Sequence, residues 1–244
     1  FFQTGLSQKH NLAFGGAAQD NRVNYRLSAG MVRQRGVIPN SYFNRVNVTA
    51  ASQGDVNSWM KTDLSMGYTN EANNQNYKGD NGPLLSLLVW PSTDNAADYL
   101  TVTGARRRLT AANAEIDNPY FGINKNFINS RVNRLIANVG VTVTPFAWGY
   151  LKTNLGADTY ANQNLLVRNP ESAFGISSGG ILDQADDVTR NLTAQTLFNF
   201  NSRQLTKSFS VSGLVGNAVA DAKSSVDGGE GTQFLDNNFV SVNN

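Results

Sequence analysis

The feature that most constrains this chain is a repeated asymmetry in the lengths of its connections. Four pairs of strand-like segments are each joined by a short polar turn, at residues 18–21, 53–58, 144–146 and 201–207. The connections between the pairs are mostly longer, at residues 34–44, 71–130 and 161–187, and a polar tail follows Val219. Outer-membrane β-barrels have this arrangement, because one rim carries short turns and the other carries long loops. We therefore predict an all-β fold, an antiparallel transmembrane β-barrel segment of about eight strands with short periplasmic turns and long extracellular loops.

The strand-like segments alternate between apolar and polar residues. In residues 22–34 the odd positions are Val23, Tyr25, Leu27, Ala29 and Met31, and the even positions are mostly polar. A period of two places all the apolar side chains on one face of a strand. The other segments with this pattern are residues 10–17, 45–51, 60–69, 134–144, 147–160, 189–200 and 208–216. Lengths of roughly nine to fourteen residues favour tilted membrane crossings over a soluble sandwich, whose strands have about five or six residues.

Composition excludes a helical membrane span. The most apolar stretch, residues 84–90, has seven residues and includes Ser86, whereas a membrane helix needs about 20 apolar residues. Only helices and closed barrels satisfy their backbone in lipid, so any span in this chain is built from strands. Charged residues make up 16% of the chain, below the roughly 25% of soluble domains. The net charge of +2 is too small to predict a nucleic-acid partner.

Aromatic residues mark the ends of several expected strands. Trp59, Phe146 and Trp148 lie beside short turns, and Tyr68 and Tyr160 lie towards the opposite ends of their strands. Membrane barrels place such rings at their two lipid–water interfaces. The alternative interpretation is that aromatic residues are common in any β-sheet.

The sequence offers little for catalysis or for cofactor and metal binding. The chain has no cysteine and a single histidine, His10, and no G-x-S-x-G motif is present. One histidine cannot form a catalytic triad or a multi-histidine metal site. We therefore predict that the protein is not an enzyme and has no catalytic, cofactor-binding or metal-binding residues.

Three polar motifs have both a functional and a simpler interpretation. Asp117 and the pair Asp186 and Asp187 are acidic residues of a kind that sometimes binds calcium, but their spacing favours solvated loops. The glycine-rich residues 228–231 have no flanking strand–helix pattern of a phosphate loop and are expected to form a linker or loop. The basic residues 106–108 are expected in a hydrated loop, with anionic lipopolysaccharide or a partner as the alternative.

The long connection at residues 71–130 carries most of the unexplained apolar content. An external loop with this much apolar area packs on itself, on a neighbouring loop or on a partner. Aromatic side chains also stack on sugar faces and anchor interfaces. Our candidates for partner-facing or ligand-facing residues are Trp90, Tyr99, Tyr120 and Phe121.

Several consecutive motifs carry a resemblance to a known family. They are GLSQKHNLAFGG at residues 5–16, NYRLSAG at 24–30, RGVIPN at 35–40, DNPYF at 117–121 and RLIANVG at 134–140. In this order and spacing, the motifs resemble a stretch of the SusC/RagA-type TonB-dependent transporters. The resemblance covers most of the chain and is weakest after residue 209.

The resemblance implies a wide barrel of about 22 strands that is blocked by a plug domain. It also implies import of an oligosaccharide or a peptide across the bacterial outer membrane, with a SusD-like surface lipoprotein as the lid and TonB as the source of energy. Residues 1–244 are expected to form part of the barrel domain, without the plug, the TonB-contacting segment and the closing strands. The alternatives are a complete small outer-membrane barrel that acts as a pore or an anchor, and a soluble secreted β adhesin or binding module.

Overall fold

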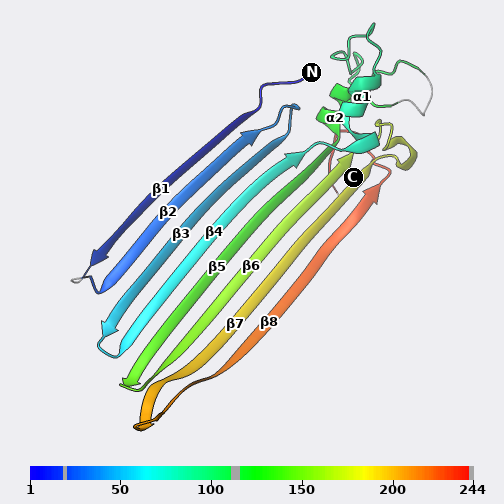
Figure 1. The fold of residues 1–244 in the computed structure, drawn as a ribbon. Coiled ribbons are helices and arrows are strands. Elements are labelled where there is room, and N and C mark those ends of the chain that lie inside the picture. Colours follow the sequence, from blue (N-terminus) through cyan, green and yellow to red (C-terminus); the bar gives the residue numbers. More distant parts are fainter. Residues whose placement is uncertain (19–20, 111–115, 242–244) are drawn as a thin grey trace.

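The computed structural model describes every residue except 19–20, 111–115 and 242–244. Its main element is one antiparallel sheet in which eight strands follow each other in sequence order, as Figure 1 shows. The strands are β1 (Leu6–Ala18), β2 (Val23–Arg35), β3 (Tyr42–Asn57), β4 (Met60–Gln75), β5 (Phe127–Phe146), β6 (Gly149–Arg168), β7 (Ile181–Thr206) and β8 (Phe209–Thr232). This confirms the predicted all-β antiparallel fold.

Four short helical segments lie outside the sheet. They are η1 (Gly79–Asn81), α1 (Pro83–Val89), α2 (Pro119–Lys125) and η2 (Ile176–Ser178). The two α-helices gather at one end of the sheet, near both chain termini (Figure 1). No helix in the described part of the chain combines the length and apolarity needed to cross a membrane.

The connections have the predicted asymmetry, but the strands are longer than predicted. The described short turns are residues 58–59, 147–148 and 207–208, so the turn predicted at residues 144–146 belongs to β5 and the true turn follows it. Part of the first predicted turn lies outside the described residues. β5 and β6 have 20 residues each, β7 has 26 and β8 has 24. The longer strands reduce the last long connection, predicted at residues 161–187, to residues 169–180.

The prediction for the polar tail was wrong for a physical reason. The segment after Val219 continues β8 up to Thr232, and the glycine-rich residues 228–231 pair with residues 182–185 of β7. Backbone hydrogen bonds hold such a pair together whether or not its side chains are apolar, so the loss of alternation does not end the strand. Asp186 and Asp187 likewise belong to β7 and not to a loop.

The register confirms that the sheet has one apolar face. A single row of paired positions crosses seven strands through Phe14, Leu27, Ala50, Met66, Ala137, Ala157 and Leu192. Its side chains are not covered, and Leu27 and Met66 are each 51% exposed. We call this side of the sheet the apolar face and the other side the polar face. No second sheet covers the apolar face within the described residues.

The polar face is crossed by side-chain hydrogen bonds and ion pairs between neighbouring strands. Ser28 and Thr49 lie 2.5 Å apart through their hydroxyl oxygens. The Arg134 guanidinium donates to both carboxylate oxygens of Asp158, at 3.0 and 2.7 Å. Cross-strand polar pairs of this kind stabilise a sheet surface that faces water.

Several aromatic residues near two of the short turns form one connected group. The rings of Phe146 and Trp148 stack with centroids 5.0 Å apart, and Phe198 meets Trp148 edge-on at 6.1 Å. Towards the opposite end of the apolar face, the Tyr68 hydroxyl donates to the Asn133 side chain at 2.9 Å. The prediction for Tyr160 was wrong, because its pairing opposite Arg134 places it on the polar face.

Candidate functional site

At the end of the sheet that carries the helices, three connections pack together into an ordered region, which we call the rim. It consists of residues 36–41 between β2 and β3, the described part of residues 76–126 between β4 and β5, and residues 169–180 between β6 and β7. The small buried apolar core of the described residues lies at this end of the molecule, and it consists of Phe121 and Ile123 of α2 and of Val167 and Leu182 at the rim ends of β6 and β7.

The local sequence explains both α-helices of the rim. α2 begins with an Asn-Pro pair, in which the Asn118 side chain accepts hydrogen bonds from the backbone N–H groups of Tyr120 and Phe121, at 2.8 and 3.3 Å. Asparagine is favoured as a helix N-cap and proline at the first helical position. α1 also begins with a proline, Pro83, after Gly82. α1 packs against α2, so the two short helices support each other.

A buried ion pair joins two segments of the rim. Arg106 and Asp117 lie 3.3 Å apart, and their side chains are only 3% and 6% exposed. The Asp117 carboxylate also accepts hydrogen bonds from the Ser172 hydroxyl at 2.6 Å and from the Ala173 N–H at 2.7 Å. The Asn126 side-chain amide donates to the same carboxylate at 3.3 Å. We call Arg106, Asp117, Asn126 and Ser172 the rim clamp.

Arg106 extends the clamp to backbone groups on both connections. Its guanidinium donates to the carbonyl oxygens of Ile116 and Glu171, each at 2.9 Å. The backbone N–H of Arg106 donates to the Glu171 carboxylate at 2.7 Å. A buried charge is stable only when it is paired and hydrogen-bonded, and this one is both. The rim clamp therefore fixes residues 76–126 against residues 169–180.

These contacts correct two sequence predictions. Arg106 was expected in a hydrated loop and is 7% exposed instead. Its neighbour Arg107 pairs with the Asp94 carboxylate at 2.6 Å. Asp117 was expected in a solvated loop, and it is the centre of the rim clamp. In the described part of the chain, no three His, Cys, Asp or Glu side chains come together as a metal ion would require.

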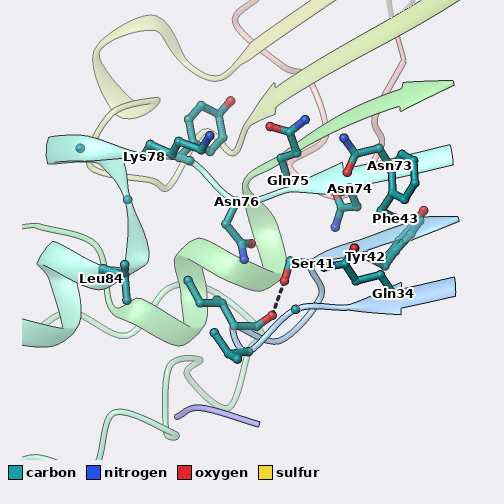
Figure 2. Close-up of a pocket in the computed structure, with 16 residues that line it drawn as sticks. Gln34, Ser41, Tyr42, Phe43, Asn73, Asn74, Gln75, Asn76, Lys78 and Leu84 are labelled. Carbon is teal, nitrogen blue, oxygen red and sulfur yellow. Dashed lines mark hydrogen bonds between the residues drawn. The ribbon is translucent and has the colours of Figure 1, made fainter. Parts of the chain in front are cut away.

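The rim also contains a cavity of about 580 Å³, which we call the rim cavity. Its walls come from the end of β2, the start of β3, the end of β4 and the beginning of α1, as Figure 2 shows. Four consecutive amide side chains, Asn73, Asn74, Gln75 and Asn76, line one side. The aromatic residues Tyr42, Phe43 and Tyr77 also contribute, and among the described lining residues only Lys78 is charged.

Asn40 fixes the loop that forms one edge of the rim cavity. Its backbone has φ = 65°, a left-handed conformation that asparagine tolerates better than most residues. Its side-chain amide donates to the Ile123 carbonyl and to the Asn124 side chain, each at 2.9 Å. The Ser41 hydroxyl donates to the Ile38 carbonyl at 2.6 Å, the bond drawn in Figure 2. The short β2–β3 loop is therefore tied directly to α2.

Tyr77 closes another edge of the cavity. Its hydroxyl donates to the Val167 carbonyl at 3.1 Å, and the Arg168 guanidinium lies 5.3 Å from the centre of its ring. Burial of the side chain raises the pKa of the Tyr77 hydroxyl above its usual value of 10.0. The exposed lining of the cavity is mostly apolar, with a few amide groups among it, which suits ligands that combine apolar faces with hydroxyl or amide groups.

The structure does not bring the four sequence-predicted candidates together into one pocket. The Trp90 indole N–H donates to Asp94 at 2.9 Å, and the Tyr99 carbonyl accepts from the Arg107 N–H at 2.9 Å. The Tyr120 ring packs edge-on against Phe1, 5.1 Å between centroids. Trp90, Tyr99 and Tyr120 are all partly exposed.

Phe121 differs from the other three candidates because it is 1% exposed and belongs to the core of the rim. Sequence reasoning also missed the rim cavity, whose amide wall is the run NNQN at residues 73–76. That run was read as loop, although most of it ends β4. Four consecutive amides at the end of an alternating strand are a signal that would have found it.

α1 presents a cluster of apolar side chains to solvent. Its buried residues are Pro83 and Ser86, so the leucines on its other sides remain uncovered. Leu88 is 81% exposed, and Leu84, Leu85 and Val89 are also exposed. Exposed apolar clusters on a protein surface mark sites of interaction. We call these four residues the α1 patch.

Comparisons with known proteins show where this fold occurs. No protein-family model matches the chain, and no curated protein matches it. The sheet and rim are similar to the solved structure of the RagAB peptide importer in the "closed-closed" state, with a TM-score of 0.74 and 17% identity. The "open-open" state of that importer matches with a TM-score of 0.70 and 16% identity. The structure of the RagAB peptide transporter matches with a TM-score of 0.70 and 17% identity.

Each match covers 99% of this chain and 27% of the matched chain. The chain thus spans about a quarter of the length of the structures that it resembles. At this level of identity the likeness supports the SusC/RagA relationship at the level of the fold alone.

Proposed function

We propose that this chain is part of the wall and outer rim of a TonB-dependent transporter of the SusC/RagA type in the bacterial outer membrane. The observation that carries the proposal is the continuous apolar face, which ends at a built polar rim. An uncovered apolar face over eight strands is stable in lipid and unstable in water. The likeness to the RagAB peptide importer supports the same conclusion.

The sheet is open, which favours a wider barrel over a complete small one. Within the described residues, β1 and β8 each pair with one neighbour, so these eight strands do not close on themselves. An unpaired strand edge exposes backbone groups that lipid cannot satisfy. We propose that other parts of the protein supply the remaining strands, the plug and the TonB-contacting segment.

The imported substrate class is an oligosaccharide or a peptide. Both classes carry many neutral hydrogen-bonding groups, which match the amide and aromatic lining of the rim cavity. The polar face adds paired charges along the interior of the wall, such as Arg134 with Asp158 and Arg45 with Glu71.

The proposed partner at the rim is a SusD-like surface lipoprotein that contacts the α1 patch. A lidding partner would cover the leucines that α1 leaves exposed, and burial of each such side chain contributes about 1.5–3 kcal/mol. Trp90, Tyr99 and Tyr120 lie in the same connection and are proposed as further contacts.

The function is tested with the full-length transporter in bacteria that depend on it for growth on an oligosaccharide or a peptide. The double variant Leu84→Gln/Leu88→Gln is expected to reduce both the amount of lipoprotein that co-purifies and the rate of uptake. The matched control is Val102→Gln, since Val102 is fully exposed but outside the α1 patch. Unchanged co-purification in the double variant would count against the partner surface, and a freely water-soluble full-length protein would overturn the proposed function.

A further inference from the structure

The apolar face is not uniform, because it contains a groove of about 410 Å³ across β5 to β8. Ala137 and Ala157 are directly opposite each other in the register, and Ala194 pairs with Leu155 on the next strand. Larger apolar residues, including Val139 and Leu192, also line the groove. On a lipid-facing surface, a depression of this kind holds an apolar chain and not water.

Two positively charged side chains lie on the rim side of the groove. Leu192 and Asp221 form its last row towards the rim, and two residues further along both strands Arg190 lies directly opposite Lys223. Like charges at directly opposite positions destabilise a strand pair unless an anion lies between them. Asp221 supplies only one compensating carboxylate, 3.9 Å from Arg190, and both of these side chains are about half exposed.

Lys223 is exposed and has no ion-pair partner in the described part of the chain. The next carboxylates on this face are Asp186 and Asp227, which are opposite each other four residues closer to the rim than Arg190 and Lys223. Their repulsion limits how far towards the rim an anion can bind. The most favourable anion position is therefore beside Arg190 and Lys223.

The position of this pair along β7 corresponds to lipid headgroup depth. Arg190 is ten residues from Phe200, which belongs to the aromatic group near the short turns. At roughly 3.3 Å per residue and a tilt of about 45°, this separation spans about 23 Å of the bilayer. That value is close to the ~25 Å height of the apolar band of an outer-membrane barrel.

We propose that the groove and the Arg190–Lys223 pair bind a phosphorylated lipid of the outer leaflet. The phosphate lies between the guanidinium of Arg190 and the ammonium of Lys223, where charge-assisted hydrogen bonds to phosphate oxygens form. An acyl chain of the same lipid fills the groove below. The inference rests on the membrane location in the proposed function, and it is independent of the imported substrate and of the lidding partner.

The full-length transporter, purified in an uncharged detergent, is titrated with lipid A and with dephosphorylated lipid A, and bound lipid is measured by native mass spectrometry. The wild-type protein is expected to bind lipid A more tightly than the dephosphorylated form by about tenfold. Arg190→Gln/Lys223→Gln is expected to lose this preference. Because it also removes a like-charge pair, this variant should be at least as stable as the wild-type protein in the uncharged detergent, so its loss of binding does not reflect misfolding.

The matched control is Arg33→Gln/Arg131→Gln. Both arginines are exposed on the apolar face beyond its apolar rows, but neither has a cation directly opposite. This control is expected to keep the preference for lipid A. An equal loss in both double variants would show a diffuse charge effect and would overturn the site, as would unchanged binding in Arg190→Gln/Lys223→Gln.

Two further measurements test the kind of ligand. Ala157→Phe fills the groove and is expected to weaken lipid A binding without changing the charge, so unchanged binding would overturn the acyl position. Inorganic phosphate at millimolar concentration is expected not to displace lipid A, and efficient displacement would show a simple anion site and overturn the lipid proposal. Measured uptake separates the two proposals, because loss of lipid preference with normal import concerns only this site.

Discussion

Arg106 and Asp117 form an ion pair 3.3 Å long that is almost completely removed from solvent. Both side chains come from the connection between β4 and β5, but the carboxylate is also bound by Ser172 and Ala173 from the connection between β6 and β7. The pair therefore holds together two segments that are more than fifty residues apart in the chain. A buried pair of this kind is sensitive to the loss of either charge, because the remaining charge stays desolvated.

The first prediction concerns this pair. Asp117→Asn removes the buried carboxylate that Arg106, Ser172 and Ala173 share, so we expect the rim to be destabilised by roughly 3–5 kcal/mol. The measurement is the rate of protease cleavage within residues 76–126 and 169–180 of the full-length protein in detergent. The matched control is Asp94→Asn, which removes the partner of the more exposed Arg107. Equal protection of residues 169–180 in wild type and Asp117→Asn would contradict the clamp.

The second prediction is a local loss of stability in acid. The hydrogen bond from Arg107, helped by one from Trp90, holds the pKa of the Asp94 carboxyl below its usual 3.8. Because the pKa is lower in the folded protein, this contribution is present above about pH 3.8 and is lost as the pH falls through the depressed value. Pepsin cleavage within residues 90–107 should therefore rise steeply below pH 3.8. Asp94→Asn should flatten this dependence, and an identical acid profile in both proteins would contradict it.

The third prediction concerns Tyr77 at alkaline pH. Burial raises the pKa of its hydroxyl above 10.0, so the associated stability is complete below pH 10 and is lost as the pH rises through the higher folded value. Tyr77→Phe keeps the ring and removes the ionisable group. Hydrogen exchange at the Val167 end of β6 should increase above pH 10 in the wild-type protein and should not show this increase in the variant. Tyr42→Phe, another aromatic residue of the rim cavity, should behave like the wild type.

The fourth prediction concerns a ring that covers a glycine. Tyr25 lies opposite Gly16, and a methyl group on Gly16 would come within 2.9 Å of the Tyr25 hydroxyl oxygen and 3.1 Å of the ring carbon that bears it. Gly16→Ala should force the ring to move, and because Tyr25 is 46% exposed the cost in urea unfolding of the detergent-solubilised protein should be at the low end for an overpacked site, about 1 kcal/mol. Gly67→Ala is the control, since its methyl group would meet only Thr49 at an ordinary 3.6 Å. If both variants unfold at the same urea concentration, the close contact has no energetic role.

The alternation of residues was sufficient to predict the sheet, because each strand buries or exposes its side chains with a period of two. It located all eight strands and the correct apolar face for Leu151, Leu192 and Phe198. It failed at the strand ends, where both faces meet water and side-chain polarity no longer distinguishes strand from loop. Tyr160 shows a related error. It was expected at a lipid interface because it is an aromatic residue near a strand end, but its place in the alternation of β6 puts it on the polar face.

The rim was much harder to predict. Asp117 and Ser172 are 55 residues apart, and nothing in the sequence near either residue indicates that they meet. Phe121 was recognised as unusual for a loop, but its 1% exposure depends on how α2 packs. The helix start at Asn118 was in principle readable, because an asparagine followed by proline is a recognised helix-start signal.

The strands β5 to β8 keep pairing well past the last apolar rows before their connections begin. Neighbouring backbones joined in this way leave no window between them. In a transporter oriented as proposed, the paired ends of β5 to β8 extend beyond the lipid on the extracellular side. A substrate at the cell surface therefore cannot enter the barrel laterally between these strands. At this part of the wall, entry is possible only through the extracellular opening of the barrel, so a lid over that opening is enough to control it.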